Sequence, residues 1–210
     1  WMYKVKPYEI WRYDFNNVII YTVAGFFLHI IANSVRIKEF VLTRKINIQK
    51  DTDDLTGLKN KAALTREINE FLADRSQDKG IMLMIDINNF KVVNDTYGHD
   101  VGDSVIKQFG AFLNDTFTER DIVGRFGGDE FIAFMKGVVD LESAGEIARK
   151  VLDGAEKNIV MPDEGKKITV SIGIAAYHGV EKNYSEIFKR ADMALYKAKA
   201  ERDVGYSICP

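Results

Sequence analysis

A glycine pair, Gly127-Gly128, separates two strand-type segments, and this feature constrains the fold more than any other. Residues 122–126 and 130–134 are both strand-type in composition, and a glycine pair between two such runs is typical of a β-hairpin. The strands of a hairpin run antiparallel, whereas a doubly wound sheet is mostly parallel. The sequence therefore predicts a sheet with at least one antiparallel pair.

Helical and strand-type segments alternate along residues 51–210. Apolar residues recur at helical spacing in four segments, and short continuous apolar runs predict buried strands. The predicted helices are residues 61–73, 102–117, 142–158 and 184–200. The further predicted strands are residues 81–85, 168–175 and 206–208. This mixture indicates an α+β fold, a mixed sheet with helices on its faces, preceded by a long N-terminal helix.

The N-terminal part of the chain differs from the rest, because residues 15–35 carry no charged side chain. A membrane-spanning helix needs about 20 predominantly apolar residues. Aromatic residues before the run and basic residues after it are typical of the two interfaces of a membrane. We expect a span at about residues 18–35, which His29, Asn33 and Ser34 interrupt.

Alternatives stay open for this segment. A soluble helix could bury the same apolar face in a dimer, whereas a cleaved signal peptide is disfavoured because no small-residue cleavage site follows the run. Beyond the run, four of six residues in a heptad seam are apolar, which fits a two-stranded coiled coil or an ordinary connector helix. The seam positions are 30, 34, 37, 41, 44 and 48. We assign residues 1–50 to a membrane or dimerisation helix with its connector, and residues 51–210 to a catalytic domain.

Charge and cysteine content exclude some classes of function. Lysine and arginine number 29 against 31 aspartates and glutamates, a net charge of −2, so the chain lacks the character of a general nucleic-acid binder. Cys209 is the one cysteine, which rules out an internal disulfide or a multi-cysteine metal site and fits a reducing compartment. From the balanced charge we expect no nucleic-acid polymer as a partner.

Three acidic residues are expected to meet at one edge of the sheet. Asp86 directly follows a predicted buried strand, and Asp129 and Glu130 directly follow the hairpin turn. A buried carboxylate needs a partner, a hydrogen bond or a metal ion, because its transfer out of water is costly. If the strands are neighbours, these oxygens suit Mg²⁺, which proteins usually hold through one or two carboxylates plus substrate phosphates.

Each of these features also has a purely structural interpretation. The glycine pair is explained by the turn alone, although a backbone without side chains also lets a nucleotide approach closely. Taken alone, Asp86 would more often be a strand-end cap or a surface acid. His99 alone would more often be a structural hydrogen-bonding residue than a catalytic one. Asn94 and Asp103 offer groups that could recognise a guanine edge, and each could equally cap a helix. Only the combination favours a function.

Four sequence blocks together resemble the GGDEF family of diguanylate cyclases. They occur in the family's order and at its spacing, and cover about residues 51–205. The blocks are Asp53-x-Leu55-Thr56-Gly57-Leu58-x-Asn60; Asp86-Ile87-x-x-Phe90-Lys91-x-x-Asn94-Asp95-x-x-Gly98-His99-x-x-Gly102-Asp103; Arg125-x-Gly127-Gly128-Asp129-Glu130-Phe131; and Ser171-Ile172-Gly173-Ile174-Ala175 with Ala191-Asp192-x-Ala194-Leu195-Tyr196-x-Ala198-Lys199.

The resemblance implies a fold similar to the palm of polymerases and nucleotidyl cyclases, and the conversion of two GTP molecules into cyclic di-GMP and two pyrophosphates. Each domain of a homodimer would hold one GTP and two Mg²⁺ ions, with Mn²⁺ as an alternative ion. The catalytic residues that it implies are Glu130 and Asp129. The implied metal ligands are Asp86, the carbonyl of Ile87, Asp129 and Glu130. The implied substrate-binding residues are Asn89, Phe90, Lys91, Asn94, His99, Asp103, Gly127, Gly128 and Lys199.

The same resemblance implies a role for each substrate-binding group. Asn94 and Asp103 would recognise guanine, the backbone at residues 89–91 would meet the phosphates, and Lys199 would support them. The N-terminal helix would control how two domains meet. With the predicted span, the protein would lie in the inner membrane with its catalytic domain in the cytoplasm. A wholly cytoplasmic protein is the alternative.

The chain departs from the family pattern at four places. Thr118 replaces the arginine of the Arg-x-x-Asp product-inhibition motif, and a hydroxyl cannot make the bidentate phosphate contact of a guanidinium. Asn88 replaces a usual aspartate, and Lys61 a usual arginine. The C-terminal tail lacks the usual glycine, and Asp203 stands at the place of the phosphate-binding arginine unless a one-residue deletion brings Arg202 there.

These departures leave competing hypotheses for the function. An active diguanylate cyclase is the first, because the metal and guanine positions are intact. A catalytically weak GTP-binding or signalling module that acts through partner contacts is the second, favoured by the altered tail. A related nucleotidyl cyclase with a different product is the third.

Overall fold

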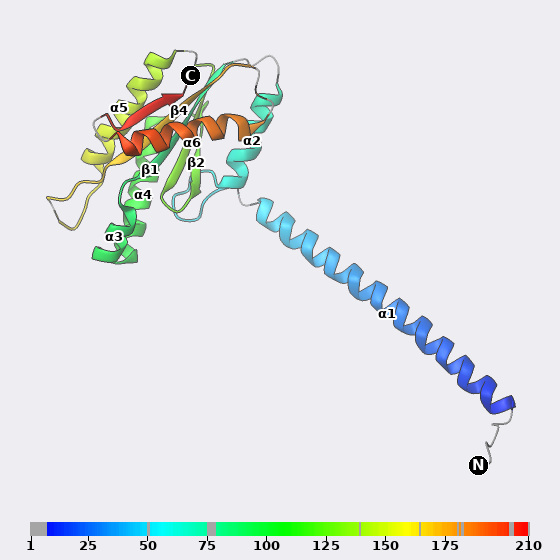
Figure 1. The fold of residues 1–210 in the computed structure, drawn as a ribbon. Coiled ribbons are helices and arrows are strands. Elements are labelled where there is room, and N and C mark those ends of the chain that lie inside the picture. The colour runs from blue at the N-terminus through cyan, green and yellow to red at the C-terminus, as the bar shows by residue number, and fades with distance from the viewer. Residues whose placement is uncertain are drawn as a thin grey trace. The chain divides into compact units, whose positions relative to one another are not determined.

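The computed structural model describes residues 8–49, 51–74, 79–138, 140–163, 165–179, 181, 183–201 and 204–209. The chain divides into two compact units, Trp1–Gln49 and Lys50–Pro210. In the first unit the described residues form one helix, α1 (Tyr8–Gln49), and the other helices and strands belong to the second unit (Figure 1).

Helix α1 runs without a break through the predicted span. Within it, Asp14–Phe40 is long and apolar enough to cross a membrane. This criterion uses length and composition alone, and a signal sequence near an N-terminus also meets it. Polar side chains in this stretch bond inside the helix. The Thr22 hydroxyl donates to the Val18 carbonyl at 2.7 Å, and the Asn33 amide nitrogen lies 3.3 Å from the His29 ring nitrogen Nε2. Inside a lipid bilayer, the polar groups of a helix need such bonding partners within the protein. The membrane span itself stays a prediction.

The predicted heptad seam is described only in part. Ile30, Ser34 and Ile37 are exposed within this unit. The side chains at positions 41, 44 and 48 lie outside the described part of the chain, so the coiled coil also stays a prediction.

A five-stranded sheet forms the centre of the second unit (Figure 1). Its strands lie in the order β2-β3-β1-β4-β5. They are β1 (Gly80–Ile87), β2 (Ile122–Gly127), β3 (Glu130–Lys136), β4 (Val170–Tyr177) and β5 (Tyr206–Cys209). Strands β4 and β5 run parallel, and the other neighbours run antiparallel. The predicted hairpin between β2 and β3, and the mixed sheet, are therefore confirmed.

Among the described residues of the second unit, five helices pack around this sheet. They are α2 (Lys61–Ala73), α3 (Phe90–Tyr97), α4 (His99–Thr116), α5 (Leu141–Asn158) and α6 (Tyr184–Ala200). The predicted helix 102–117 in fact begins at His99, because Gly98 has a positive φ of 85° and separates α3 from α4. Strand β1 continues through Asp86 to Ile87, so Asp86 lies in the strand and does not follow it.

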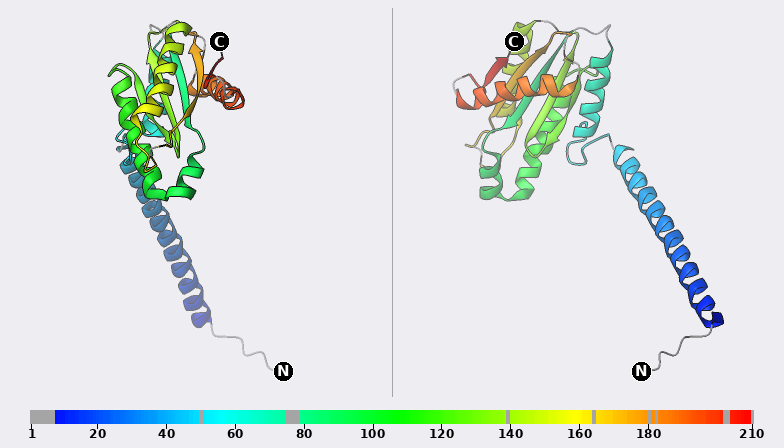
Figure 2. Two further views of the ribbon diagram at one scale, coloured as in Figure 1. Left: turned by 90° about the vertical axis from the view of Figure 1, so that its left-hand side faces the viewer. Right: turned by 45° about the vertical axis from the view of Figure 1, so that its right-hand side comes forward.

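The two faces of the sheet carry different helices. Side chains at odd positions of β1 pack with residues of α4 and α5, and those at even positions pack with residues of α2 and α6. Figure 2 shows α6, in orange to red, on one side of the sheet, and α4 and α5 on the other. Asp86 stands at an even position, so it lies on the face that α6 covers.

Candidate active site

Asp86 and Glu130 face each other across neighbouring strands. They are register partners in the antiparallel pairing of β1 and β3, and cross-strand partners share one face of a sheet. Next to Glu130 in the chain, the Asp129 carbonyl accepts a hydrogen bond from the Ile87 N–H at 3.3 Å. The structure thus brings the predicted acidic residues to two adjacent strand ends.

Burial and like charge act together on these acids. Asp86 is 8% exposed. Burial raises the pKa of Asp86, Lys199 lowers it and Asp129 raises it again, and the result is above the usual value. The pKa of Glu130 is also raised, first by burial and then by the charges of Asp86 and Asp129. A cation placed among these carboxylates would relieve that repulsion.

Lys199, in the last turn of α6, already contributes one such cation. Its Nζ lies 2.8 Å from Asp86 Oδ2. Within the described residues, no three His, Cys, Asp or Glu side chains converge as a preformed group of metal ligands. By type, however, the carboxylates of Asp86, Asp129 and Glu130 and the Ile87 carbonyl are the hard oxygen donors that Mg²⁺ prefers. The donor set therefore fits the predicted ion.

The hairpin turn is open at the surface. Gly128 has φ of 56°, a conformation that glycine adopts without steric cost, and a Cβ at Gly127 or Gly128 would have nothing within 4 Å. The positive φ of Gly128 supports the structural interpretation of the glycine pair. The open space at both glycines also leaves room for a ligand close to the backbone.

Arg125 connects this turn to the start of the domain. Its Nε donates to the Gly128 carbonyl at 2.9 Å, and its Nη1 lies 3.2 Å from Asp53 Oδ1. Burial raises the pKa of Asp53, but hydrogen bonds from Thr56 and the charge of Arg125 together bring it below the usual value. The sequence blocks contained both residues, but gave no signal that Asp53 and Arg125 pair.

Helix α3 begins directly after β1, close in the chain to the same strand end. Asn89 has φ of 56°, which starts α3 directly after the strand. The first described backbone bonds of this helix run from the N–H groups of Val92 and Val93 to the Asn89 carbonyl. The N–H groups of Phe90 and Lys91 come before these bonds, in the first turn of α3. The N-terminal end of a helix is the end at which anions bind.

The two predicted guanine-recognising residues lie on adjacent helices. Asn94 is on α3 and Asp103 on α4, and a Cβ at Gly102 would collide with the Asn94 amide oxygen. Gly102, the residue before Asp103, thus lets the Asn94 side chain lie against α4. His99, the first residue of α4, is exposed near the Gly98 junction.

Three of the four positions at which the chain departs from the family pattern have a structural explanation. Thr118 donates from its N–H and its hydroxyl to the Asp121 carboxylate, at 3.0 and 2.8 Å. The Asn88 side chain bonds to Thr169 and Ser171 at the start of β4. Lys61 lies over the Phe126 ring, 3.9 Å from its centroid. The fourth departure, at residues 202 and 203, lies outside the described residues.

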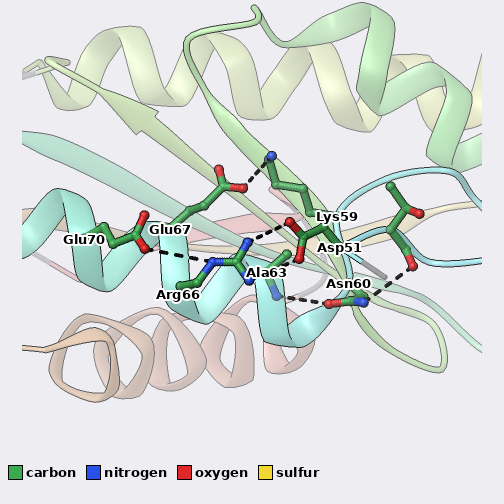
Figure 3. A network of polar contacts seen from close by, with 8 residues as sticks. Asp51, Lys59, Asn60, Ala63, Arg66, Glu67 and Glu70 are labelled. Atoms are coloured by element: carbon green, nitrogen blue, oxygen red, sulfur yellow. Dashed lines mark hydrogen bonds and ion pairs between the residues drawn. The ribbon is translucent and has the colours of Figure 1, made fainter. Parts of the chain in front are cut away.

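The first residues of the domain are fixed to α2 by a polar network (Figure 3). Arg66 donates to both carboxylate oxygens of Asp51, at 3.1 and 2.9 Å, and lies 3.9 Å from Glu70. Lys59 donates to Glu67 at 2.7 Å. This network and the contacts of Asp53 hold the start of the second unit against both α2 and the hairpin.

Comparison with known proteins identifies the family. Residues 50–203 match the family described as diguanylate cyclase, GGDEF domain. The chain therefore belongs to the GGDEF-domain family, as the resemblance predicted.

Two curated relatives match most of this chain. Diguanylate cyclase DgcP of Pseudomonas aeruginosa is 38% identical over 160 residues, which are 72% of this chain and 23% of that protein. Probable diguanylate cyclase DgcC of Escherichia coli K12 is 36% identical over 158 residues, 74% of this chain and 42% of that protein. The chain thus spans less than half the length of either relative.

A solved structure confirms the fold. The crystal structure of the coiled coil and GGDEF domain of DgcB from Caulobacter crescentus, in complex with c-di-GMP, superposes with a TM-score of 0.71. It is 22% identical in sequence and covers 90% of this chain and 100% of that one. At this identity the likeness supports the architecture alone.

Proposed function

We propose that this chain is a diguanylate cyclase that condenses two GTP molecules into cyclic di-GMP and two pyrophosphates. The observation that carries the proposal is the cross-strand pair of Asp86 and Glu130, with Asp129 and Lys199 beside it, in a member of the GGDEF family. The names of the relatives, which are diguanylate cyclases, support the same reaction.

One GTP would bind along the surface from the junction of α3 and α4 to the end of β1. Asn94 and Asp103 would recognise the guanine edge, with His99 nearby. The backbone N–H groups at residues 89–91 and the ammonium of Lys199 would meet the phosphates. The open turn at Gly127 and Gly128 would let the nucleotide approach the backbone.

Asp86, the Ile87 carbonyl, Asp129 and Glu130 would hold two Mg²⁺ ions, or Mn²⁺ ions in their place. Bound there, the ions would stabilise negative charge on the attacking and leaving oxygens. The protein's own part is to supply oxygen donors from two rigid strands. Release of Lys199 from Asp86 would then free its ammonium for the phosphates.

The reaction needs two nucleotides held by two copies of the domain. The 3′-oxygen of one GTP forms a bond to the α-phosphorus of the other, the bond from that phosphorus to the β-phosphate oxygen breaks, and pyrophosphate leaves. The proton of the 3′-hydroxyl goes to a nearby base, for which the Glu130 carboxylate is the candidate. A second step of the same kind closes the ring, so we propose a homodimer as the active form.

The departures refine this proposal. Because Thr118 already occupies the Asp121 carboxylate and carries no guanidinium, we propose that product inhibition through this motif is absent.

We also propose that Asp14–Phe40 anchors the protein in the inner membrane with the catalytic domain in the cytoplasm, with a wholly cytoplasmic protein as the alternative.

The direct test is product analysis after incubation of the purified protein with GTP and Mg²⁺. We expect cyclic di-GMP from the parent and a loss of at least about a hundredfold in Glu130→Gln, as expected when a group needed for proton transfer is removed. Glu142→Gln, which makes the same change at an exposed position of α5, is the matched control. A folded, dimeric parent that makes no product would overturn the proposal.

That negative result would favour the second hypothesis, a GTP-binding or signalling module with weak catalysis. The altered tail at Asp203 is the observation in its favour. GTP binding without turnover, measured on the same preparation, would separate it from an inactive protein.

A further inference from the structure

A groove of about 760 Å³ extends from the acidic strand ends to helix α5. Asp86, Asn89 and Lys199 line it, and so does Arg149 of α5. The groove thus joins the candidate site to a cation that the sequence blocks do not contain.

The short edge strand explains why the groove reaches α5. Strand β5 pairs with β4 only from Ile172 to Ala175, so it does not cover the start of β4. Thr169, Val170 and Ser171, at that uncovered start, form the floor of the groove. A side chain from α5 can therefore reach the α6 side of the sheet around this edge.

Arg149 is held by a neutral group. Its Nη1 donates to the Tyr206 hydroxyl at 3.0 Å. A Cβ on Gly145, one turn earlier in α5, would lie 3.2 Å from the same hydroxyl, so the absence of a side chain there lets Tyr206 approach the helix. Because a hydroxyl carries no charge, this contact orients the guanidinium without neutralising it.

The acidic residues of the groove wall have cations of their own. Asp153 and Glu156 also line the groove. Lys157 lies 3.4 Å from Asp153, and Lys167 lies 3.4 Å from Glu156. These pairs reduce the repulsion that an entering phosphate would meet, although they are exposed and weak.

We propose that Arg149 binds the terminal phosphates of GTP as a second cation beside Lys199. This role rests on the proposed function, because it takes the groove as the place of the triphosphate. A guanidinium presents parallel N–H donors that match phosphate oxygens in a bidentate contact. Unless a one-residue deletion brings Arg202 there, the chain has Asp203 where the family pattern places an arginine, and a cation from α5 would then supply the missing charge.

The test compares nucleotides with and without the terminal phosphates, using the full chain in detergent. The probe is 3′-deoxy-GTP, which lacks the attacking hydroxyl and cannot condense, and GMP is the reference ligand. Arg149→Gln should weaken binding of 3′-deoxy-GTP about tenfold, as for loss of one charge-assisted contact, and leave GMP binding unchanged. Arg149→Lys should give an intermediate loss.

Lys150→Gln is the matched control, because it removes the same charge from the next residue of α5, which is exposed and does not line the groove. Thermal melting establishes that each variant folds. Equal losses for Arg149→Gln and Lys150→Gln, or equal losses for both nucleotides, would overturn the assignment. A parent that makes no cyclic di-GMP but shows the Arg149 effect would refute the cyclase proposal and leave this one standing.

Discussion

Gly102 is a single residue on which the geometry of the proposed guanine site depends. Any side chain there would occupy the place of the Asn94 amide oxygen, so the Asn94 side chain would have to leave its place against α4. We expect Gly102→Ala to raise the KM for GTP about tenfold, since one hydrogen-bonding group for guanine is displaced. Steady-state kinetics measure this change.

The control for Gly102→Ala is Gly165→Ala, because a Cβ at Gly165 would make only an ordinary contact of 3.5 Å with Asp163. An unchanged KM in Gly102→Ala, with the fold intact, would show that Asn94 does not contribute to guanine binding.

Asp53 is the second residue whose substitution has a defined consequence. It accepts bonds from Thr56 and pairs with Arg125, and these contacts lower its pKa against the opposing effect of burial. We expect Asp53→Asn to reduce the free energy of unfolding by about 1–2 kcal/mol at neutral pH. Denaturant unfolding of the parent and the variant measures the difference.

The sign of the pH dependence follows from the lowered pKa of Asp53. The stability that the ionised carboxylate contributes is present above the usual aspartate value of about 4, and is lost as the pH falls through the lowered value. The difference between parent and variant should therefore shrink in acid. Asp115→Asn, at an exposed position of α4, is the control, and a difference that grows on acidification would contradict the account.

At the scale of the elements, the sequence predicts those features best that depend on local patterns, such as the bounds of a regular helix. Helices α2 and α6 have the predicted bounds, because their apolar spacing is regular. The sequence did not predict that β1 continues through Asp86, since that extension depends on pairing with Glu130 of β3 and Ser171 of β4, both distant in the chain. The contact of Lys199 with Asp86 likewise depends on how α6 packs, which no local pattern encodes.

The packing of α6 on the sheet depends on Gly173 of β4. A Cβ there would clash with the backbone of Ala191 and Leu195, so the whole helix would have to move. We expect Gly173→Ala to lower the free energy of unfolding by about 3 kcal/mol, at the upper end for overpacking, with a Tm lower by roughly 6–12 °C. Because α6 carries Lys199, activity should fall as well.

Gly154→Ala in α5 is the control for this change. The three atoms nearest to a Cβ at Gly154 belong to the Phe112 ring, a partly exposed side chain and not the backbone, so the loss of stability should be smaller. A Gly173→Ala variant as stable as the parent would contradict the close approach of α6 to β4.

At the scale of the whole molecule, α1 carries the proposed membrane anchor. Its apolar stretch, Asp14–Phe40, fits a membrane span by length, and the polar side chains of Thr22, His29 and Asn33 bond within the helix. We expect residues 1–50, fused to a soluble reporter, to stay with membranes after carbonate washing. A reporter fused to residues 51–210 is the control. Complete extraction of the first fusion would refute the span and favour a soluble dimerisation helix.

The proposed function depends most directly on the identity of the reaction product. The most direct measurement is to incubate the purified full chain with Mg²⁺ and equal amounts of GTP and ATP, and to separate the products by chromatography. Because we propose that Asn94 and Asp103 recognise one guanine edge in each domain, we predict cyclic di-GMP as the sole cyclic dinucleotide, and none from Glu130→Gln. A hybrid dinucleotide would contradict the assigned specificity, and no product from the folded dimer would contradict the assignment of the chain as a cyclase.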